Sequence, residues 1–291
     1  MKTLRVRIHD AARRYGVPQN TIERDYAISY LLLGVASQPA LKSTLVFKGG
    51  TALRKLFFVD YRFSEDLDFS TQNAPMGDAL EQAFRATVDE ALRRLRGYGP
   101  FSVEFERYVE REPHPHGQEA FTIRLQFPWH PRPLCRLRAE ITHDEPVLMR
   151  PDKRRLIHGY EEEDLQAEVY AYRLEEIVAE KLRTLLQTRQ KLLSRGWARP
   201  HARDYYDLWR ILDTFGASLD GEQLVPLLRA KCQHRGVSFS GLDDFFSEDL
   251  VAYASDHWDA SLRPFVAQLP GCHDVLDQLR LLLGPLFALG A

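Results

Sequence analysis

Two aspartates separated by one leucine, Asp66 and Asp68, are the residues of this chain best suited to chemistry. Apolar and polar residues alternate over 62–69, which predicts a β-strand. Residues i and i+2 of a strand share a face, so we expect both carboxylates on one side and Leu67 in the core. Two carboxylates this close repel each other unless a cation lies between them. Such ligands suit Mg²⁺, which takes one or two carboxylates together with substrate phosphates. A solvated edge strand with two surface acids is the alternative.

A pair of glycines, Gly49 and Gly50, precedes these aspartates and is followed by Thr51. The apolar run 45–48 predicts a short strand and residues 51–56 predict a short helix, so the glycines lie at a strand-to-helix turn. Glycine lets the backbone approach a ligand closely, and the first N–H groups of a helix attract an anion. The Thr51 hydroxyl adds a donor. If this turn and the aspartate strand form a hairpin, a phosphate cradle and a metal site lie side by side; an ordinary turn is the alternative.

A third carboxylate is predicted in the alternating segment 134–142. Its apolar residues share one face, which places Glu140 on the opposite face. If this strand neighbours the aspartate strand, Glu140 reaches the metal. An ion pair between Glu140 and Arg138 is the alternative, and Asp144 is the fallback as a third acid.

A lysine, Lys181, falls within the apolar stripe of a predicted helix over residues 173–193. A lysine on a buried face is costly unless its ammonium finds an anion or extends to water. The placement predicts a phosphate-binding lysine, with extension to water as the alternative.

The segment 181–203 that begins at this lysine contains seven lysines and arginines and no acid. Such a stretch suits a triphosphate or a nucleic-acid backbone, although a solvated loop is also consistent with it. Another helix begins after Pro200. In a helical-wheel projection of this helix, Asp204 lies at the margin of the apolar stripe and Asp207 lies further toward solvent. Acids in a first helical turn often complement the helix dipole, so side-chain chemistry alone leaves the role of Asp204 open.

The elements that must position these residues are predicted to include both helices and strands. Residues 164 to the end are expected to be helical almost throughout. The pattern predicts an α+β fold, in which a small mixed sheet with flanking helices precedes a helical C-terminal half. We expect a core region over 1–160 and a helical region over 161–291 that completes the active site. The sheet and its helices are predicted from helical periodicity over 5–37, with a turn at 16–18, and over 77–96, and from alternating runs at 101–105, 121–127 and 137–141.

The composition is that of an ordinary globular protein. The chain has 291 residues, of which 44% are hydrophobic and 27% charged, and this excludes a disordered or low-complexity chain. The formal net charge is -2, so any affinity for nucleic acid must come from a local patch. No apolar run is long enough for a membrane span and the N-terminus lacks a secretory core. The 3 cysteines form neither a disulfide framework nor a zinc site, which favours the cytoplasm.

Taken together and in order, four segments of the chain resemble the nucleotidyltransferase family of AbiEii/AbiGii-type toxins, which includes the MenT toxins. The resemblance spans roughly residues 5–215. The first two segments along the chain are specific for this family as a pair. The last two are specific for it only because they follow the first two. The four segments are residues 47–55, 62–69, 175–182 and 203–208.

The resemblance implies a polymerase-β-like nucleotidyltransferase core and transfer of a nucleoside monophosphate from an NTP to the 3′ end of tRNA, which blocks translation. It also implies Mg²⁺ as cofactor and a cognate antitoxin, often a winged-helix regulator, as partner. Many nucleotidyltransferases have Gly-Ser where this chain has Gly-Gly-Thr, which keeps a hydroxyl donor. By position, the resemblance assigns triphosphate binding to Gly49, Gly50 and Thr51, metal binding to Asp66 and Asp68, phosphate contact to Lys181 and the last catalytic acid to Asp204.

Two other functions are consistent with parts of the sequence. A nucleotidyltransferase that modifies a small hydroxylated molecule would use the same motifs with a different acceptor pocket. Residues 11–22 also resemble half of a DNA-binding helix-turn-helix. A recognition helix presents Arg, Gln or Asn to the groove, whereas the helix that follows here is acidic and apolar.

Overall fold

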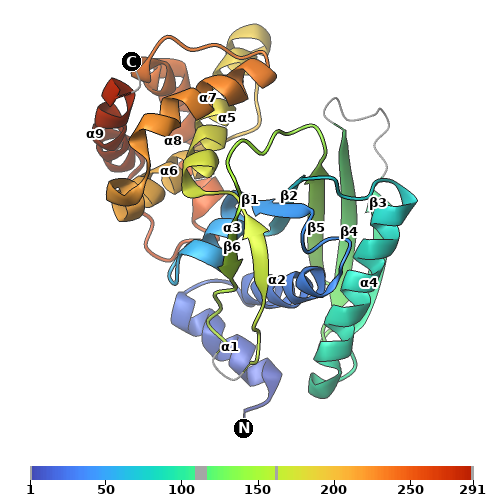
Figure 1. The fold of residues 1–291 in the computed structure, drawn as a ribbon. Helices are drawn as coiled ribbons and strands as arrows, with labels where there is room; N and C mark the ends of the chain where they lie inside the picture. Colours follow the sequence, from blue (N-terminus) through green and yellow to red (C-terminus); the bar gives the residue numbers. More distant parts are fainter. Residues whose placement is uncertain (1, 109–116, 161–162, 290–291) are drawn as a thin grey trace. The chain divides into compact units, whose positions relative to one another are not determined.

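A mixed sheet of seven described strands organises the first of two units, Met1–Tyr172, and helices build the second, Arg173–Ala291 (Figure 1). The computed structural model describes residues 2–108, 117–160 and 163–289. The strand order is β3-β4-β5-β2-β1-β7-β6, with parallel pairing between β1 and β7 and between β2 and β5 and antiparallel pairing elsewhere. The expected α+β fold, a mixed sheet with flanking helices and a helical C-terminal part, is confirmed.

The strands of the first unit are β1 (Leu45–Lys48), β2 (Asp66–Thr71), β3 (Ser102–Tyr108), β4 (Gln118–Gln126), β5 (Cys135–Thr142), β6 (Asp152–Arg155) and β7 (Glu168–Ala171). Its α-helices are α1 (Leu4–Tyr15), α2 (Gln19–Ser37), α3 (Gly49–Ala52) and α4 (Asp78–Leu95). A π-helical turn, Leu53–Phe57, continues α3, and a 3₁₀ turn, Arg96–Tyr98, follows α4.

Helix α4 covers one face of the sheet because its apolar residues recur every three or four positions. The ring of Phe84 on α4 lies 6.4 Å from the ring of Phe69 on β2 and 4.9 Å from that of Phe121 on β4. The rings of Phe47 on β1 and Phe69 stack at 5.0 Å. These contacts place the core between α4 and the face of the sheet opposite Asp66 and Asp68.

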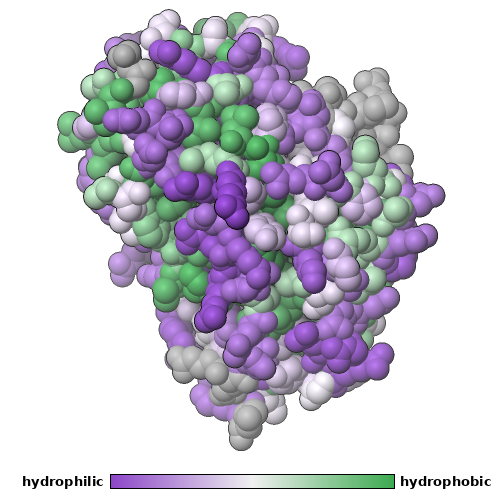
Figure 2. All heavy atoms as spheres, in the orientation of Figure 1, coloured by the Kyte–Doolittle hydropathy of each residue, from purple (hydrophilic) through white to green (hydrophobic). Residues whose placement is uncertain are grey.

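Helix α2 is enclosed on almost all sides, because most of its residues between Thr21 and Val35 are buried. A helix so enclosed serves as a core element and presents no recognition surface. On the outside of the first unit, hydrophilic side chains predominate in the face that Figure 2 shows.

Two expectations about elements are wrong. The aspartate strand begins at Asp66, not at residue 62. The expected helical region from residue 164 instead contains the strand β7, and α5 begins only at Leu174. Strand β7 is four residues long, too short for its alternation to be distinguished in the sequence, and it forms because β1 and β6 pair with its two edges.

The second unit contains α5 (Leu174–Arg195), α6 (Ala202–Phe215), α7 (Gly221–His234), α8 (Glu248–Leu262) and α9 (Cys272–Leu289), with 3₁₀ turns at Gly216–Ser218 and Leu242–Phe246. A fully buried ion pair joins α5 to α7: Lys231 Nζ lies 3.0 Å from Glu176 Oε1, and neither side chain is exposed. None of the described helices has the length and apolar character that a membrane crossing requires.

Candidate active site

The glycine turn lies directly against the aspartate strand. Strands β1 and β2 pair antiparallel with Lys48 opposite Asp68, which confirms the expected pairing of the two segments. Gly49 has φ +78°, and a Cβ placed on it would lie 2.6 Å from Oδ2 of Asp68. A side chain at this position would therefore be strained in the backbone and would overlap the carboxylate. A Cβ on Gly50 would overlap the guanidinium of Arg62, which is buried.

Thr51 connects this turn to β2 through its side chain. Its hydroxyl donates to the backbone carbonyl of Asp66, and the residue is 1% exposed. The hydroxyl therefore points into the protein. Thr51 can act on an anion only through its backbone, in the first turn of α3. This bond fixes the start of α3 relative to the first aspartate.

Asp66 and Asp68 are half-buried on β2, and Leu67 between them is buried in the core. This alternation is the one that the sequence predicts. Strand β5 runs parallel beside β2 and pairs Asp68 with Glu140 and Asp66 with Arg138. Because paired residues of neighbouring strands project to the same face, Glu140 shares a face with the two aspartates.

The carboxylate of Glu140 has two protein partners. Oε1 lies 2.8 Å from Nε of Arg138, and Oε2 accepts a hydrogen bond of 2.6 Å from Nε2 of Gln118. The structure therefore contains both arrangements that the sequence allows, adjacency to Asp68 and an ion pair with Arg138. Asp144 is exposed beyond the end of β5. Across residues 2–108, 117–160 and 163–289, no three His, Cys, Asp or Glu side chains form a ready-made metal cage.

The sequence analysis missed Lys48, which is buried opposite Asp68. Its ammonium lies 5.6 Å from the ring of Tyr172, and the Tyr172 hydroxyl is 2.7 Å from Oγ of Ser70. A buried cation on the same face as two carboxylates reduces their repulsion. Its position just before a glycine pair is the signal that could have identified it.

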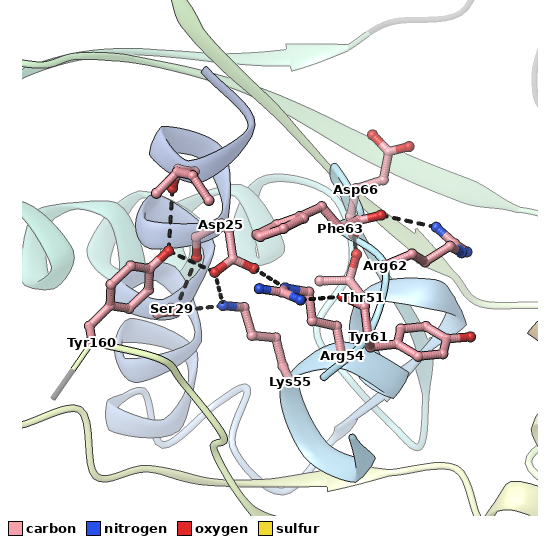
Figure 3. Close-up of polar contacts among 11 residues, drawn as sticks. Asp25, Ser29, Thr51, Arg54, Lys55, Tyr61, Arg62, Phe63, Asp66 and Tyr160 are labelled. Atoms are coloured by element: carbon pink, nitrogen blue, oxygen red, sulfur yellow. Dashed lines mark hydrogen bonds and ion pairs between the residues drawn. The ribbon is translucent and has the colours of Figure 1, made fainter. Parts of the chain in front are cut away.

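A buried polar network holds the helical segment that follows the glycine turn (Figure 3). Asp25 on α2 accepts from Nε of Arg54 at 2.7 Å, lies 2.8 Å from Nζ of Lys55 and accepts from the Tyr160 hydroxyl at 2.7 Å. Lys55 also donates to the hydroxyl of Ser29 at 2.9 Å. Burial raises the pKa of Asp25, but the two cations more than offset this and hold its pKa well below the usual range. Burial lowers the pKa of Lys55 to about 8, a shift that Asp25 only partly opposes.

In the second unit, Lys181 on α5 is bound to two carboxylates of α6. Its Nζ lies 2.6 Å from Oδ1 of Asp204 and 2.7 Å from Oδ2 of Asp207. Nδ1 of His201 lies 2.9 Å from the other oxygen of Asp204. The expected buried position of Lys181 is confirmed, with an exposure of 8%, and its anionic partners in this structure are carboxylates.

The expectation that Asp207 lies toward solvent is wrong, because its exposed fraction is 0%. Ile211, one turn further along α6, is also completely buried, so the buried face of α6 is wider than the expected apolar stripe. The ammonium of Lys181 compensates the buried charge. Burial raises the pKa of Asp204, but Lys181 and the hydrogen bond from His201 outweigh burial and hold its pKa far below the usual value.

The basic segment 181–203 contains arginines that are buried or bonded within the second unit and other cations that are exposed. Arg183 is buried, Nη1 of Arg189 lies 2.6 Å from Oδ1 of Asp244, and Nε of Arg203 donates to the carbonyl of Ser261 at 2.9 Å. These arginines stabilise the second unit. The exposed cations lie at the end of α5 and beyond it.

A cavity of about 770 Å³ lies elsewhere in the first unit, beside β6 and β7. Its lining includes Lys42, Lys153, Arg155 and His158. Neither the glycine turn nor the aspartates of β2 are among its described lining residues, so the cavity is separate from the candidate active site.

The chain matches known proteins in its family and in its fold. A family model described as nucleotidyl transferase AbiEii toxin, type IV TA system, matches residues 30–279. The fold is similar to that of the nucleotidyltransferase toxin MenT4 from Mycobacterium tuberculosis H37Rv, with a TM-score of 0.66 and 20% sequence identity over 98% of this chain and 90% of that chain. No curated protein sequence matches.

Proposed function

Because this chain belongs to the AbiEii family of nucleotidyltransferase toxins of type IV toxin–antitoxin systems, we propose that it transfers a nucleoside monophosphate from an NTP to the 3′ end of tRNA and so blocks translation. The observation that carries this proposal is the contact between the glycine turn and Asp68, where a Cβ on Gly49 would lie 2.6 Å from the carboxylate. A site for a triphosphate beside a site for a divalent cation is what nucleotidyl transfer requires.

Gly49, Gly50 and Thr51 hold the triphosphate in this proposal. The first backbone N–H groups of α3 lie in this turn, and anions bind well at the start of a helix. The inward hydroxyl of Thr51 holds the turn in place through the Asp66 carbonyl. Lys48 adds positive charge on the same side of the sheet.

Asp66 and Asp68 hold Mg²⁺ in this proposal. Two carboxylates on one face of a strand fit an ion that takes one or two protein carboxylates and completes its shell with water and phosphate oxygens. Glu140 joins them as a third ligand when its carboxylate leaves Arg138 and Gln118. When bound, Mg²⁺ neutralises charge on the triphosphate and lowers the pKa of the attacking hydroxyl.

The reaction is an in-line substitution at the α-phosphorus. The acceptor 3′ oxygen forms a bond to this phosphorus and its hydroxyl proton passes to solvent. The bond to the oxygen that bridges the α- and β-phosphates breaks, and pyrophosphate leaves with the electron pair. Lys181 contacts the nucleotide phosphates as a compact positive charge. Asp204 is the last catalytic acid, and with Asp207 it holds the ammonium of Lys181 in place.

The family implies an antitoxin partner. We propose that this partner is a regulator of the winged-helix type and that the reaction takes place in the cytoplasm, where tRNA and NTPs are found. A DNA-binding role for residues 11–22 lacks support, because the following helix α2 is enclosed in the core.

The proposal is tested by incubating the protein with Mg²⁺, total tRNA and each of the four α-labelled NTPs, with Asp68→Ala in parallel. We expect label in tRNA with the wild type and none with the variant. Label in a small hydroxylated acceptor instead of tRNA would contradict the proposed substrate and leave the reaction class intact. No label in either acceptor, with the protein shown to be folded, would contradict the proposed function.

A further inference from the structure

The C-terminal end of α5 and the loop that follows it present a tryptophan among cations. Lys191, Arg195, Trp197 and Arg199 are all exposed, and Trp197 has an exposed fraction of 68%. We call these four residues the α5 tip. The exposed face of an aromatic ring can stack on a ligand, and here it lies close in sequence to three exposed cations.

The backbone of the α5 tip is held in place. Gly196 ends α5 in the left-handed conformation, with φ 68°, and its N–H donates to the carbonyl of Leu192. Ala198, between Trp197 and Arg199, is buried, and its carbonyl accepts a hydrogen bond from the Tyr253 hydroxyl. Because Ala198 is anchored, the side chains of Trp197 and Arg199 lie at the surface on a fixed backbone. A fixed backbone reduces the conformational entropy that is lost when a ligand binds.

The three cations of the α5 tip have no carboxylate partner among residues 2–108, 117–160 and 163–289. Exposed arginines elsewhere on the chain do have such partners: Arg93 and Arg94 on α4 both pair with Glu90 at 2.7 Å. The α5 tip therefore combines three cations without a carboxylate partner and one exposed aromatic ring within residues 191–199. This combination is complementary to a polyanion that also offers flat rings.

We propose that the α5 tip binds single-stranded RNA, with a base stacked on Trp197 and backbone phosphates contacting Lys191, Arg195 and Arg199. Stacking requires a base whose face is not already covered by its neighbours, so an unpaired RNA end fits and a duplex does not. The inference rests on the proposed function, in which the acceptor is the 3′ end of an RNA. It assigns an element of the second unit that binds this RNA.

The stacking contact is tested by fluorescence anisotropy with a labelled single-stranded RNA, without NTP and without Mg²⁺. We expect Trp197→Ala to weaken binding by about fivefold or more, since base–aromatic stacking contributes roughly 1–3 kcal/mol and about 1.4 kcal/mol corresponds to tenfold. Leu193→Ala is the matched control, because Leu193 is equally exposed at 66% on the same end of α5 and offers no ring. Equal weakening by both variants would contradict stacking on Trp197.

The charges are tested by the salt dependence of binding. For single strands the slope of log K against log salt is about −0.7 per phosphate neutralised, so we expect the triple variant Lys191→Gln, Arg195→Gln, Arg199→Gln to reduce the slope by about 2. Arg93→Gln, on a paired arginine of α4, is expected to leave it unchanged. An unchanged slope in the triple variant would overturn the proposal, as would tighter binding of duplex than of single-stranded RNA.

Failure of this inference is distinguishable from failure of the proposed function. If the wild type labels tRNA and Trp197→Ala does so with the same KM, the proposed function stands and the α5 tip is not the acceptor site. If RNA binds with the expected dependence on Trp197 but no label is transferred, the docking site stands and the proposed function fails. Binding of an acidic protein in place of RNA at these residues would overturn the inference.

Discussion

Gly49 and Asp68 approach each other across the β1–β2 pair so closely that a Cβ on the glycine would lie 2.6 Å from the carboxylate oxygen. The glycine has φ +78°, a conformation that L side chains rarely adopt. Two independent constraints, backbone conformation and space, thus require glycine at this position. The same closeness makes the turn and the carboxylate parts of one site.

Gly49→Ala is expected to reduce nucleotide transfer by about a hundredfold, because displacement of the carboxylate by about an ångström is enough for such a loss. Labelled transfer to tRNA measures the effect. Gly97→Ala is the control, since a Cβ there would meet nothing within 4 Å and its backbone is not left-handed. Full activity in Gly49→Ala would show that the turn tolerates a displaced carboxylate.

Asp66→Asn and Asp68→Asn are each expected to lower Mg²⁺-dependent transfer by about a thousandfold or more, since loss of metal binding removes several kcal/mol of transition-state stabilisation. The midpoint of thermal unfolding should change little, because both side chains are only half-buried. Asp89→Asn, at an exposed position of α4, is the control for loss of one carboxylate. Retained Mg²⁺-dependent activity in both β2 variants would refute the metal assignment.

The free energy of unfolding should depend on pH through Asp204. Its pKa is held below the ordinary value of 3.8, so its contribution to stability is fully present above that pH and is lost as the pH falls toward the lower folded pKa. Asp204→Asn should therefore lower the unfolding free energy by a constant amount above about pH 5, and the difference from wild type should shrink below about pH 4. Urea unfolding between pH 3 and 8 measures this difference. Asp213→Asn, at an exposed position of the same helix, is the control for the loss of one carboxylate.

Asp25→Asn is expected to destabilise the first unit by about 3–5 kcal/mol, because it leaves Arg54 and Lys55 buried without a counter-charge. Asp10→Asn removes an acid from the exposed pair with Lys2 and should cost far less, because water solvates both of these charges. Chemical denaturation of both variants gives the comparison. Similar losses in the two would mean that the buried network contributes no more than a surface pair.

Lys55 shows why the site could be read only in part from the sequence. The aspartates of β2 are visible because alternation along a single strand fixes which side chains share a face. The partners of Lys55 come from α2, thirty positions earlier, and from the segment around Tyr160. No local pattern connects residues so far apart in the chain. The sequence therefore indicated the candidate metal-binding carboxylates and missed the buried network around Lys55.

The sequence by itself determined the elements whose patterns are local: the strand–glycine turn–helix, the face shared by Asp66 and Asp68, and the buried position of Lys181 on α5. The tertiary structure alone decided the short strands β6 and β7, the register that places Glu140 beside Asp68, and the burial of Asp207 against Lys181. The physical reason is the range of the forces involved. Periodicity and backbone conformation act within a few residues, whereas strand pairing and the compensation of buried charge depend on partners that only folding brings together.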